Sequence, residues 1–258
     1  MTFSAPPWIR KLDPAARASF HVSTTMNQLE AVFANLDTWR HLPNYQLERR
    51  ADIFFSVYLR GLLEEITGVA LEDVIIPELP IKRDLIWSDL ATDKSVKVDY
   101  VLFARDRAKV FFVELKTDGG SRREAQDHYL ETAKQLGFRK IADGLCSIVR
   151  KTTAHQKYHH LLSALSGLGY VTMPADIRDF LYPAPKVGLS ERLRHVHATE
   201  ADSAIEVMYV QPAATLGDRC IDFDQFATFV ERHDDPLSRV FAPHLRKWRD
   251  AAGSTMPL

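Results

Sequence analysis

Two carboxylates and one ammonium near the middle of the chain are the residues best suited to chemistry. Asp99 lies in the run SVKVDYVLFA, and Glu114 and Lys116 lie in the run KVFFVELKT, which follows after the polar residues RDRA. β-Branched and aromatic residues joined by a short polar link are typical of a β-hairpin. Carboxylate oxygens suit a divalent cation, and Mg²⁺ is often held by one or two carboxylates together with phosphate oxygens of a substrate. The pattern therefore indicates a site for a divalent cation beside a lysine.

The strand register decides whether these groups meet. Pairing the two runs around the turn RDRA places Ala104 opposite Lys109 and Asp99 opposite Glu114. Side chains alternate between the faces of a strand, so Lys116 shares the face of Glu114. A slip of one residue would separate the carboxylates. Like charges across a hairpin are destabilising, and a divalent cation is the simplest compensation.

A long amphipathic helix is expected directly before this sheet region. Apolar residues recur at helical spacing from Gln46 to Thr67, and Gly68 is suited to end the helix. Glu48 and Asp52 extend the apolar stripe towards the N-terminus. The stripe itself consists of Phe55, Leu59, Leu62 and Ile66.

Other elements are expected on both sides of the hairpin. Proline excludes a central strand, so VIIPELPIKRDLIW predicts one edge strand or two short ones. A capping box predicts a helix after the hairpin, and later segments show helical or strand patterns. These expected elements are a helix from Met26 to Trp39, a helix that begins with Ser121 and Glu124 and ends near Gly137, a helix over KTTAHQKYHHLLSALSGL, a strand from Ala204 to Val210, and helices over QFATFVERH and PLSRVFAPHLRKWRDA, each preceded by aspartates.

The arrangement of Asp99, fourteen intervening residues and then Glu114-Leu115-Lys116 resembles the PD-(D/E)XK, or restriction-endonuclease-like, nuclease superfamily. Members of that family carry an acidic residue on one strand and an acidic-x-Lys triplet on the next, with a helix before and after. The resemblance covers residues 46–137, about a third of the chain. Val98 stands where the family name has proline.

The resemblance implies specific roles for these residues. Asp99, Glu114 and the backbone carbonyl of Leu115 would hold Mg²⁺ or Mn²⁺, which polarises the phosphate and lowers the pKa of a bound water. Lys116 would orient or help to deprotonate that water and stabilise the negative charge that develops on the phosphate. The implied reaction is hydrolysis of phosphodiester bonds, with DNA as the expected substrate.

The resemblance also implies contributions from the neighbouring helices. Family members often add a carboxylate from the preceding helix, for which Glu48 is the candidate, with Glu64 and Glu65 as runners-up. Arg122 and Arg123, at the start of the following helix, would contact backbone phosphates. Some exonuclease-like members carry glutamine and tyrosine four residues apart on that helix. Gln126 and Tyr129 are three apart here, so that subgroup is not assigned.

Composition and length agree with a folded globular protein that has a sizeable core. An apolar content of 46% and a charged content of 26% are ordinary for globular proteins. The expected fold is α/β: a central mixed sheet with an antiparallel hairpin, flanked by helices, in a restriction-endonuclease-like core with extra helices. Residues 1–25 are expected to form an arm, and residues 26–258 a single domain with C-terminal helical additions.

The charge balance constrains the partners. A net charge of −1 offers no strong overall attraction to nucleic acid, so a polyanion must be held locally. Cys146 and Cys220 are too few for a disulfide framework and are interpreted as packing residues in a reducing compartment. No secretory signal or long apolar run is evident, which predicts a cytoplasmic protein without membrane contact. The oligomeric state stays open, with a homodimer as one alternative.

Three other interpretations remain open from the sequence. The first is a nuclease-like fold that binds nucleic acid or a protein partner without cutting. The charges of the hairpin can also be surface ion pairs, each contributing ~0–1 kcal/mol. Finally, zinc can use the spacing of His155 and His159, and His195 and His197 would share a face of an extended segment, although neither pair has further ligands nearby.

Overall fold

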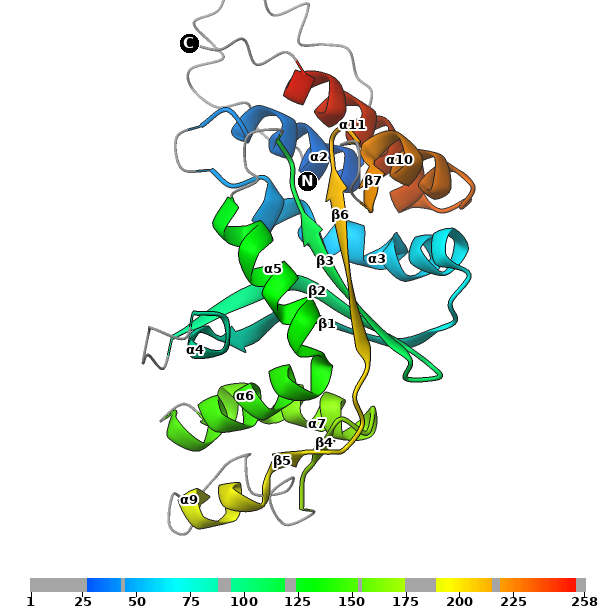
Figure 1. Cartoon of the computed structure of the whole chain (residues 1–258). Coiled ribbons are helices and arrows are strands. Elements are labelled where there is room, and N and C mark those ends of the chain that lie inside the picture. The colour runs from blue at the N-terminus through cyan, green and yellow to red at the C-terminus, as the bar shows by residue number, and fades with distance from the viewer. Residues whose placement is uncertain are drawn as a thin grey trace, which may run out of the picture.

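Helices cover both faces of a five-stranded sheet in this protein (Figure 1). The computed structural model describes residues 27–42, 45–87, 94–118, 124–152, 155–174, 189–214 and 219–253. Within them the strand order is β1-β2-β3-β6-β7. The first three strands are antiparallel, and β3, β6 and β7 are parallel to one another, so the sheet is mixed, as expected. The strands are β1 (Leu71–Lys82), β2 (Ser95–Ala104), β3 (Lys109–Leu115), β6 (Ala204–Gln211) and β7 (Cys220–Asp222).

The two faces of the sheet pack into two separate hydrophobic clusters. Alternation along β3 shows this directly, because Val110 and Phe112 belong to one cluster and Phe111 and Val113 to the other. The first cluster packs against α5 (Glu124–Leu136), α6 (Phe138–Lys151) and α7 (His159–Gly167). The second packs against α2 (Gln28–Trp39), α3 (Glu48–Thr67), α10 (Phe223–Glu231) and α11 (Pro236–Gly253).

The hairpin has the register that the sequence predicts. Tyr100 pairs with Val113 and Phe103 with Val110, and the same register places Asp99 opposite Glu114. On its other side, β3 pairs with β6 along its whole length. β3 is therefore the central strand, which explains why nearly all of its residues are buried.

The helix before the hairpin, α3, begins two residues later than expected and ends as predicted at Gly68. The φ angle of Gly68 is 68°, a left-handed conformation that glycine adopts without steric cost, and its N–H donates to the Glu64 carbonyl. The expected apolar stripe is wrong at its end. Ile66 is 47% exposed, whereas Tyr58 and Leu63 are buried. The buried face of the last turns of the helix therefore includes Leu63 and not Ile66.

The proline-containing segment forms one strand at the sheet edge, β1, rather than two short strands. Pro77 pairs with Tyr100 and Pro80 with Lys97. Proline lacks an N–H, and an edge strand needs hydrogen bonds on one side only, so both prolines fit there. A short helix, α4 (Arg83–Ile86), follows the strand.

The helix expected over KTTAHQKYHHLLSALSGL is interrupted. Instead, α6 ends at Lys151, a 3₁₀ turn η2 spans His155–Tyr158, and α7 begins at His159. Thr152 has an extended backbone conformation (φ −68°, ψ 148°). A β-branched residue loses side-chain freedom in a helix, which disfavours continuation here. Short elements complete this region: β4 (Val171–Thr172), α9 (Leu189–Arg192), η3 (Leu193–His195) and β5 (His197–Ala198).

The remaining expected elements follow the sequence closely. α5 ends just before Gly137, and β6 contains the whole predicted strand. Asp222 caps α10, and Asp235 accepts hydrogen bonds from two N–H groups at the start of α11. The expected Ser121 cap lies outside the described residues, as does the proposed arm of residues 1–25, and the domain division stays a prediction.

Two smaller findings bear on partners and packing. Cys146 is buried within the first cluster and Cys220 is partly buried against it, which agrees with a packing role. Across the described ranges, the helices are too short or too polar to cross a membrane.

Candidate active site

The end of the hairpin brings Asp99, Glu114 and Lys116 together. The Lys116 ammonium nitrogen lies 3.4 Å from a Glu114 carboxylate oxygen and 3.9 Å from an Asp99 carboxylate oxygen. Asp99 also accepts a hydrogen bond of 2.8 Å from the backbone N–H of Leu115, which ties its carboxylate to the neighbouring strand. The side chains of Glu114 and Lys116 are 0% and 5% exposed, so the ion pair between them is not a solvated surface pair.

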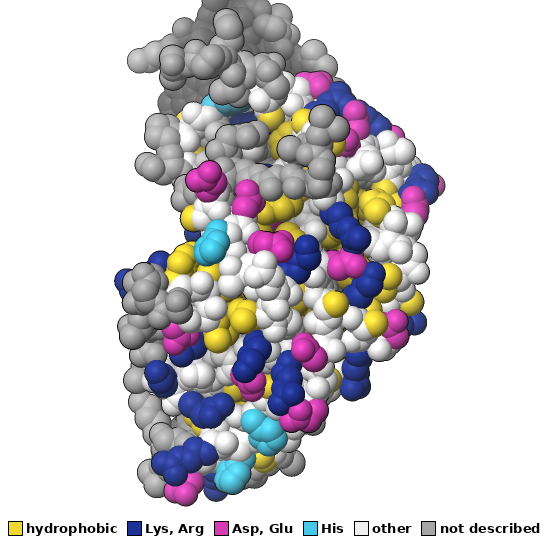
Figure 2. All heavy atoms as spheres, viewed as in Figure 1, with side chains coloured by type: hydrophobic (Ala, Val, Ile, Leu, Met, Phe, Trp, Pro, Cys, Tyr) yellow, Lys and Arg dark blue, Asp and Glu magenta, His cyan; other side chains and the backbone are white. Residues whose placement is uncertain are grey.

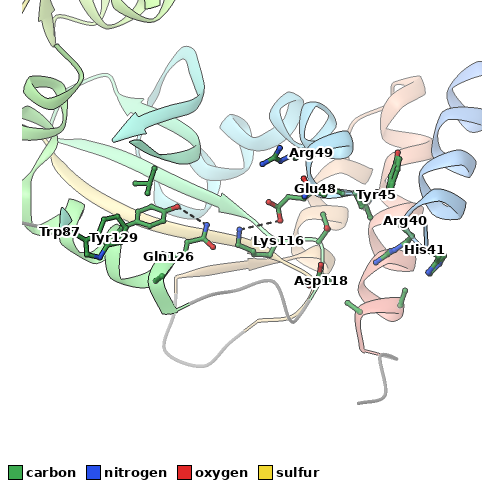
Figure 3. Close-up of a pocket in the computed structure, with 17 residues that line it drawn as sticks. Arg40, His41, Tyr45, Glu48, Arg49, Trp87, Lys116, Asp118, Gln126 and Tyr129 are labelled. Atoms are coloured by element: carbon green, nitrogen blue, oxygen red, sulfur yellow. Dashed lines mark hydrogen bonds and ion pairs between the residues drawn. The ribbon is translucent and has the colours of Figure 1, made fainter. Parts of the chain in front are cut away.

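Glu48 joins this group from the first turn of α3. One of its carboxylate oxygens lies 3.9 Å from the Lys116 ammonium (Figure 3). The two runners-up are engaged elsewhere: Glu64 accepts a hydrogen bond from the Leu71 N–H, and Glu65 pairs with Arg232. Glu48 is therefore the helix carboxylate that lies beside the hairpin.

Helix α5 supplies two further residues that the sequence did not assign to the site. Gln126 donates a hydrogen bond from its side-chain amide to one Glu114 oxygen, and the Tyr129 hydroxyl lies 3.0 Å from the other. Residues three apart lie on the same face of a helix, and this spacing is the signal that could have found them.

Burial makes the carboxylates of this site costly to ionise. Burial, followed by the negative charge of Asp99, raises the pKa of Glu114 to about 9, although Lys116 and the Tyr129 hydrogen bond oppose the shift. Burial also raises the pKa of Glu48 to about 7, against the attraction of Lys116. One ammonium thus faces three carboxylates, and the site favours an additional positive charge.

The oxygen atoms at this position are the donors that Mg²⁺ and Mn²⁺ prefer. Asp99 and Glu114 contribute carboxylates, and the Leu115 carbonyl oxygen lies beside them, where it accepts a 3.0 Å hydrogen bond from Lys116. Within the described ranges, no group of three or more His, Cys, Asp or Glu side chains is spaced for a metal ion. Mg²⁺ is often held by one or two carboxylates together with water and substrate oxygens, so these groups fit a cation of this type.

A pocket of about 670 Å³ opens over Lys116 (Figure 3). Glu48 and Lys116 line it on one side, and Gln126 and Tyr129 of α5 line it on another. Its volume is within the range of ligand-binding pockets, ~300–1,000 Å³. The remaining lining residues are Arg40, His41, Tyr45, Gln46, Leu47, Arg49, Trp87, Val96, Thr117, Asp118, Ala125, Ala251 and Ala252.

The other residues singled out from the sequence lie outside the described residues or do not line this pocket. Arg122 and Arg123 lie outside the described residues, as does the side chain of His155. The His159 ring packs edge-on against the His160 ring and does not line the pocket over Lys116. His195 and His197 do not share one strand, because His195 ends η3 and its carbonyl contacts the His197 ring nitrogen at 3.0 Å.

No family model, curated protein or solved structure matches this chain.

Proposed function

We propose that this chain is a metal-dependent nuclease that hydrolyses phosphodiester bonds in DNA, with a core like that of the PD-(D/E)XK family. One observation carries the proposal: carboxylates from two strands and a helix lie 3.4–3.9 Å from one buried lysine, beside an open pocket. Ion pairs that serve only surface solubility are solvated, whereas this lysine is 5% exposed.

In this proposal, Asp99, Glu114 and the Leu115 carbonyl hold Mg²⁺ or Mn²⁺, and Glu48 adds negative charge from α3. When bound, such a cation polarises the phosphate and lowers the pKa of a water. Lys116 stabilises the negative charge that develops on the phosphate oxygens as the bond to water forms.

Gln126 and Tyr129 act through Glu114. Their hydrogen bonds fix both oxygens of this carboxylate, which keeps it turned towards Asp99 and Lys116. Partners of metal ligands orient the ligands and raise metal affinity. We therefore assign them as positioning residues.

The test is cleavage of plasmid, linear and single-stranded DNA, and of RNA, by purified protein with Mg²⁺ or Mn²⁺. Asp99→Ala and Lys116→Ala should each reduce the rate by about 10²–10³-fold. Lys97→Ala is the matched control, because Lys97 is an exposed lysine on the same strand as Asp99 and pairs with Glu78. Cleavage that persists in both site variants would remove this site from the proposal.

The alternative is a nuclease-like fold that binds nucleic acid or a protein partner without cutting. It is favoured by the saturation of Glu114, which already contacts Lys116, Gln126 and Tyr129. Titration calorimetry with Mg²⁺ separates the two. Absence of both metal binding and cleavage in the folded protein would select the alternative.

A further inference from the structure

The pocket has a second positively charged position at the end opposite to α5. Arg40 follows the last residue of α2 and lines the pocket, as do His41 and the α11 residues Ala251 and Ala252. Figure 3 shows the Arg40 side chain extending from α2 towards the middle of the pocket, across from Lys116. Arg40 therefore lies at the end of the pocket away from α5, Lys116 lies nearer its middle, and Asp118 lies between the two cations (Figure 3).

Packing within the protein does not account for the Arg40 guanidinium. Its Nη1 atom is shielded from solvent and finds no hydrogen-bond acceptor among the described residues. A buried donor without an acceptor costs free energy, so an arginine kept here solely for structure would be expected to have one. Burial lowers the pKa of Arg40, and the negative charges of Asp37 and Asp118 oppose this shift without cancelling it.

The charge of the whole protein makes such a cation necessary for a polyanionic substrate. The net charge is −1, and the face shown in Figure 2 mixes acidic and basic side chains. Around Lys116 the carboxylates would repel any phosphate that lacks its own local cation. A guanidinium binds phosphate strongly through paired N–H groups and carries its charge at any working pH.

We infer that Arg40 binds a second phosphate of the substrate, next to the one that is cut at Lys116, so that the pocket selects polynucleotides over small phosphodiesters. This inference rests on the proposed nuclease function for the position of the first phosphate. The pocket volume of about 670 Å³ leaves room for more than a single phosphate group. Arg49 also lines the pocket, but its side chain is exposed, which makes it the weaker candidate for a fixed contact.

The test compares Arg40→Gln with a matched control, Arg50→Gln, on two substrates. Arg50 is an exposed arginine in the first turn of α3 that does not line the pocket. The substrates are a single-stranded oligonucleotide and bis(4-nitrophenyl) phosphate, which has only one phosphate. Arg40→Gln should raise KM for the oligonucleotide about tenfold or more with kcat nearly unchanged, as expected for a lost charge-assisted contact, and should leave kcat/KM for the small ester unchanged.

Arg40→Lys should restore part of the oligonucleotide affinity, which a purely structural role in ending α2 would not require. An unchanged oligonucleotide KM in Arg40→Gln would overturn the inference. So would an equal loss on both substrates, because that result indicates a damaged site rather than a missing phosphate contact.

A binding measurement separates this inference from the proposed function. Fluorescence anisotropy with a labelled oligonucleotide in Ca²⁺ reports affinity whether or not the protein cuts. If the wild-type protein cleaves neither substrate, the nuclease proposal fails on its own. Weaker binding by Arg40→Gln than by Arg50→Gln then still supports the phosphate contact, and equal binding overturns it.

Discussion

Lys116 is surrounded by more negative charge than one ammonium neutralises. Glu48, Asp99 and Glu114 all lie within 3.9 Å of its nitrogen, and two of these carboxylates have raised pKa values because they are buried. Uncompensated buried charge is destabilising, so a proton or a cation completes the site. At the scale of single residues, we therefore expect the site to gain stability when a proton or a cation binds.

Glu114→Gln tests this balance. Without divalent cations the variant should be about as stable as the wild type at neutral pH, because a pKa of about 9 leaves the Glu114 carboxyl largely protonated and the neutral amide keeps its shape. In the wild type, Mg²⁺ at about one hundred times its Kd should add about 2.7 kcal/mol to the free energy of unfolding. Urea unfolding with Mg²⁺ and with chelator measures both effects. A full Mg²⁺ stabilisation in the variant would contradict the assignment of Glu114 as a ligand.

Tyr129→Phe tests the positioning role. Loss of its hydrogen bond to Glu114 should lower the affinity of the site for metal, so that the metal concentration needed for half-maximal cleavage rises about 10-fold or more. The rate at saturating metal should change less. The control is Tyr45→Phe, which removes a hydroxyl from another wall of the same pocket. Titrating the cleavage rate with Mn²⁺ gives the comparison, and equal curves for the two variants would rule out the role.

Strand geometry explains why part of the site was predictable. Alternation along β3 and a four-residue turn suffice to bring Asp99, Glu114 and Lys116 together. The contacts of Gln126 and Tyr129 depend instead on how α5 docks against the sheet, which no local pattern specifies. The position of Arg40 in the pocket could not be predicted from the sequence for the same reason, because it depends on packing between α2, α3 and α11.

At the scale of elements, the end of α3 has a specific backbone requirement. Gly68 has φ 68°, and a Cβ atom added there would meet nothing within 4 Å, so any cost of Gly68→Ala is conformational. We expect a loss of about 1 kcal/mol in unfolding free energy. Gly167 is the control: it also has open space around it but ends α7 without a positive φ, so alanine there should be neutral or stabilising. Chemical denaturation of both variants decides the point.

Asp37 joins α2 to α11. Its carboxylate accepts a hydrogen bond from the Trp248 indole at 2.7 Å and also contacts Lys247 and His244. Burial alone would raise the pKa of Asp37, but these three partners together lower it. A carboxyl whose pKa is lower in the folded state stabilises the fold above its unfolded pKa, near 3.8, and loses that contribution as the pH falls through the folded value.

Asp37→Asn should therefore cost about 1–3 kcal/mol at neutral pH and flatten the fall of stability below pH about 4. Asp234→Asn is the control, since Asp234 is 89% exposed and pairs only at the surface with Arg239. Denaturant titrations across the acidic range provide the data. Parallel pH profiles for Asp37→Asn and the wild type would refute the assigned coupling.

The order of the strands in the sheet could not be predicted from the sequence. The run from Ala204 to Val210 is recognisable as a strand, yet its parallel pairing with β3 joins segments far apart in the chain. The three-residue strand β7 is too short for a periodic pattern. The break after α6 at Thr152 was not predicted either, because one β-branched residue disfavours a helix only slightly and the packing of α6 and α7 also contributes. Local sequence patterns predicted most helices and strands. Tertiary packing determines which of them lie next to each other.

For the whole molecule, the small net charge has a measurable effect on nucleic-acid binding. Because the protein carries a net charge of −1, a divalent cation in the site should strengthen oligonucleotide binding even at constant ionic strength. Monovalent salt should weaken it by competition for phosphates. Anisotropy titrations with Ca²⁺ test this, with the double variant Asp99→Asn/Glu114→Gln as control. An equal Ca²⁺ effect in that control would place the cation elsewhere.

The parallel pairing of β3 with β6 also has a consequence for synthesis. During synthesis the hairpin is translated long before Ala204. The backbone groups of β3 that pair with β6 therefore have no strand partner until β6 has been made. Distant parallel pairing forms late because a long loop must close first. Ribosome-bound chains that stop before Ala204 should expose this hairpin to proteases, and chains extended through α11 should protect it.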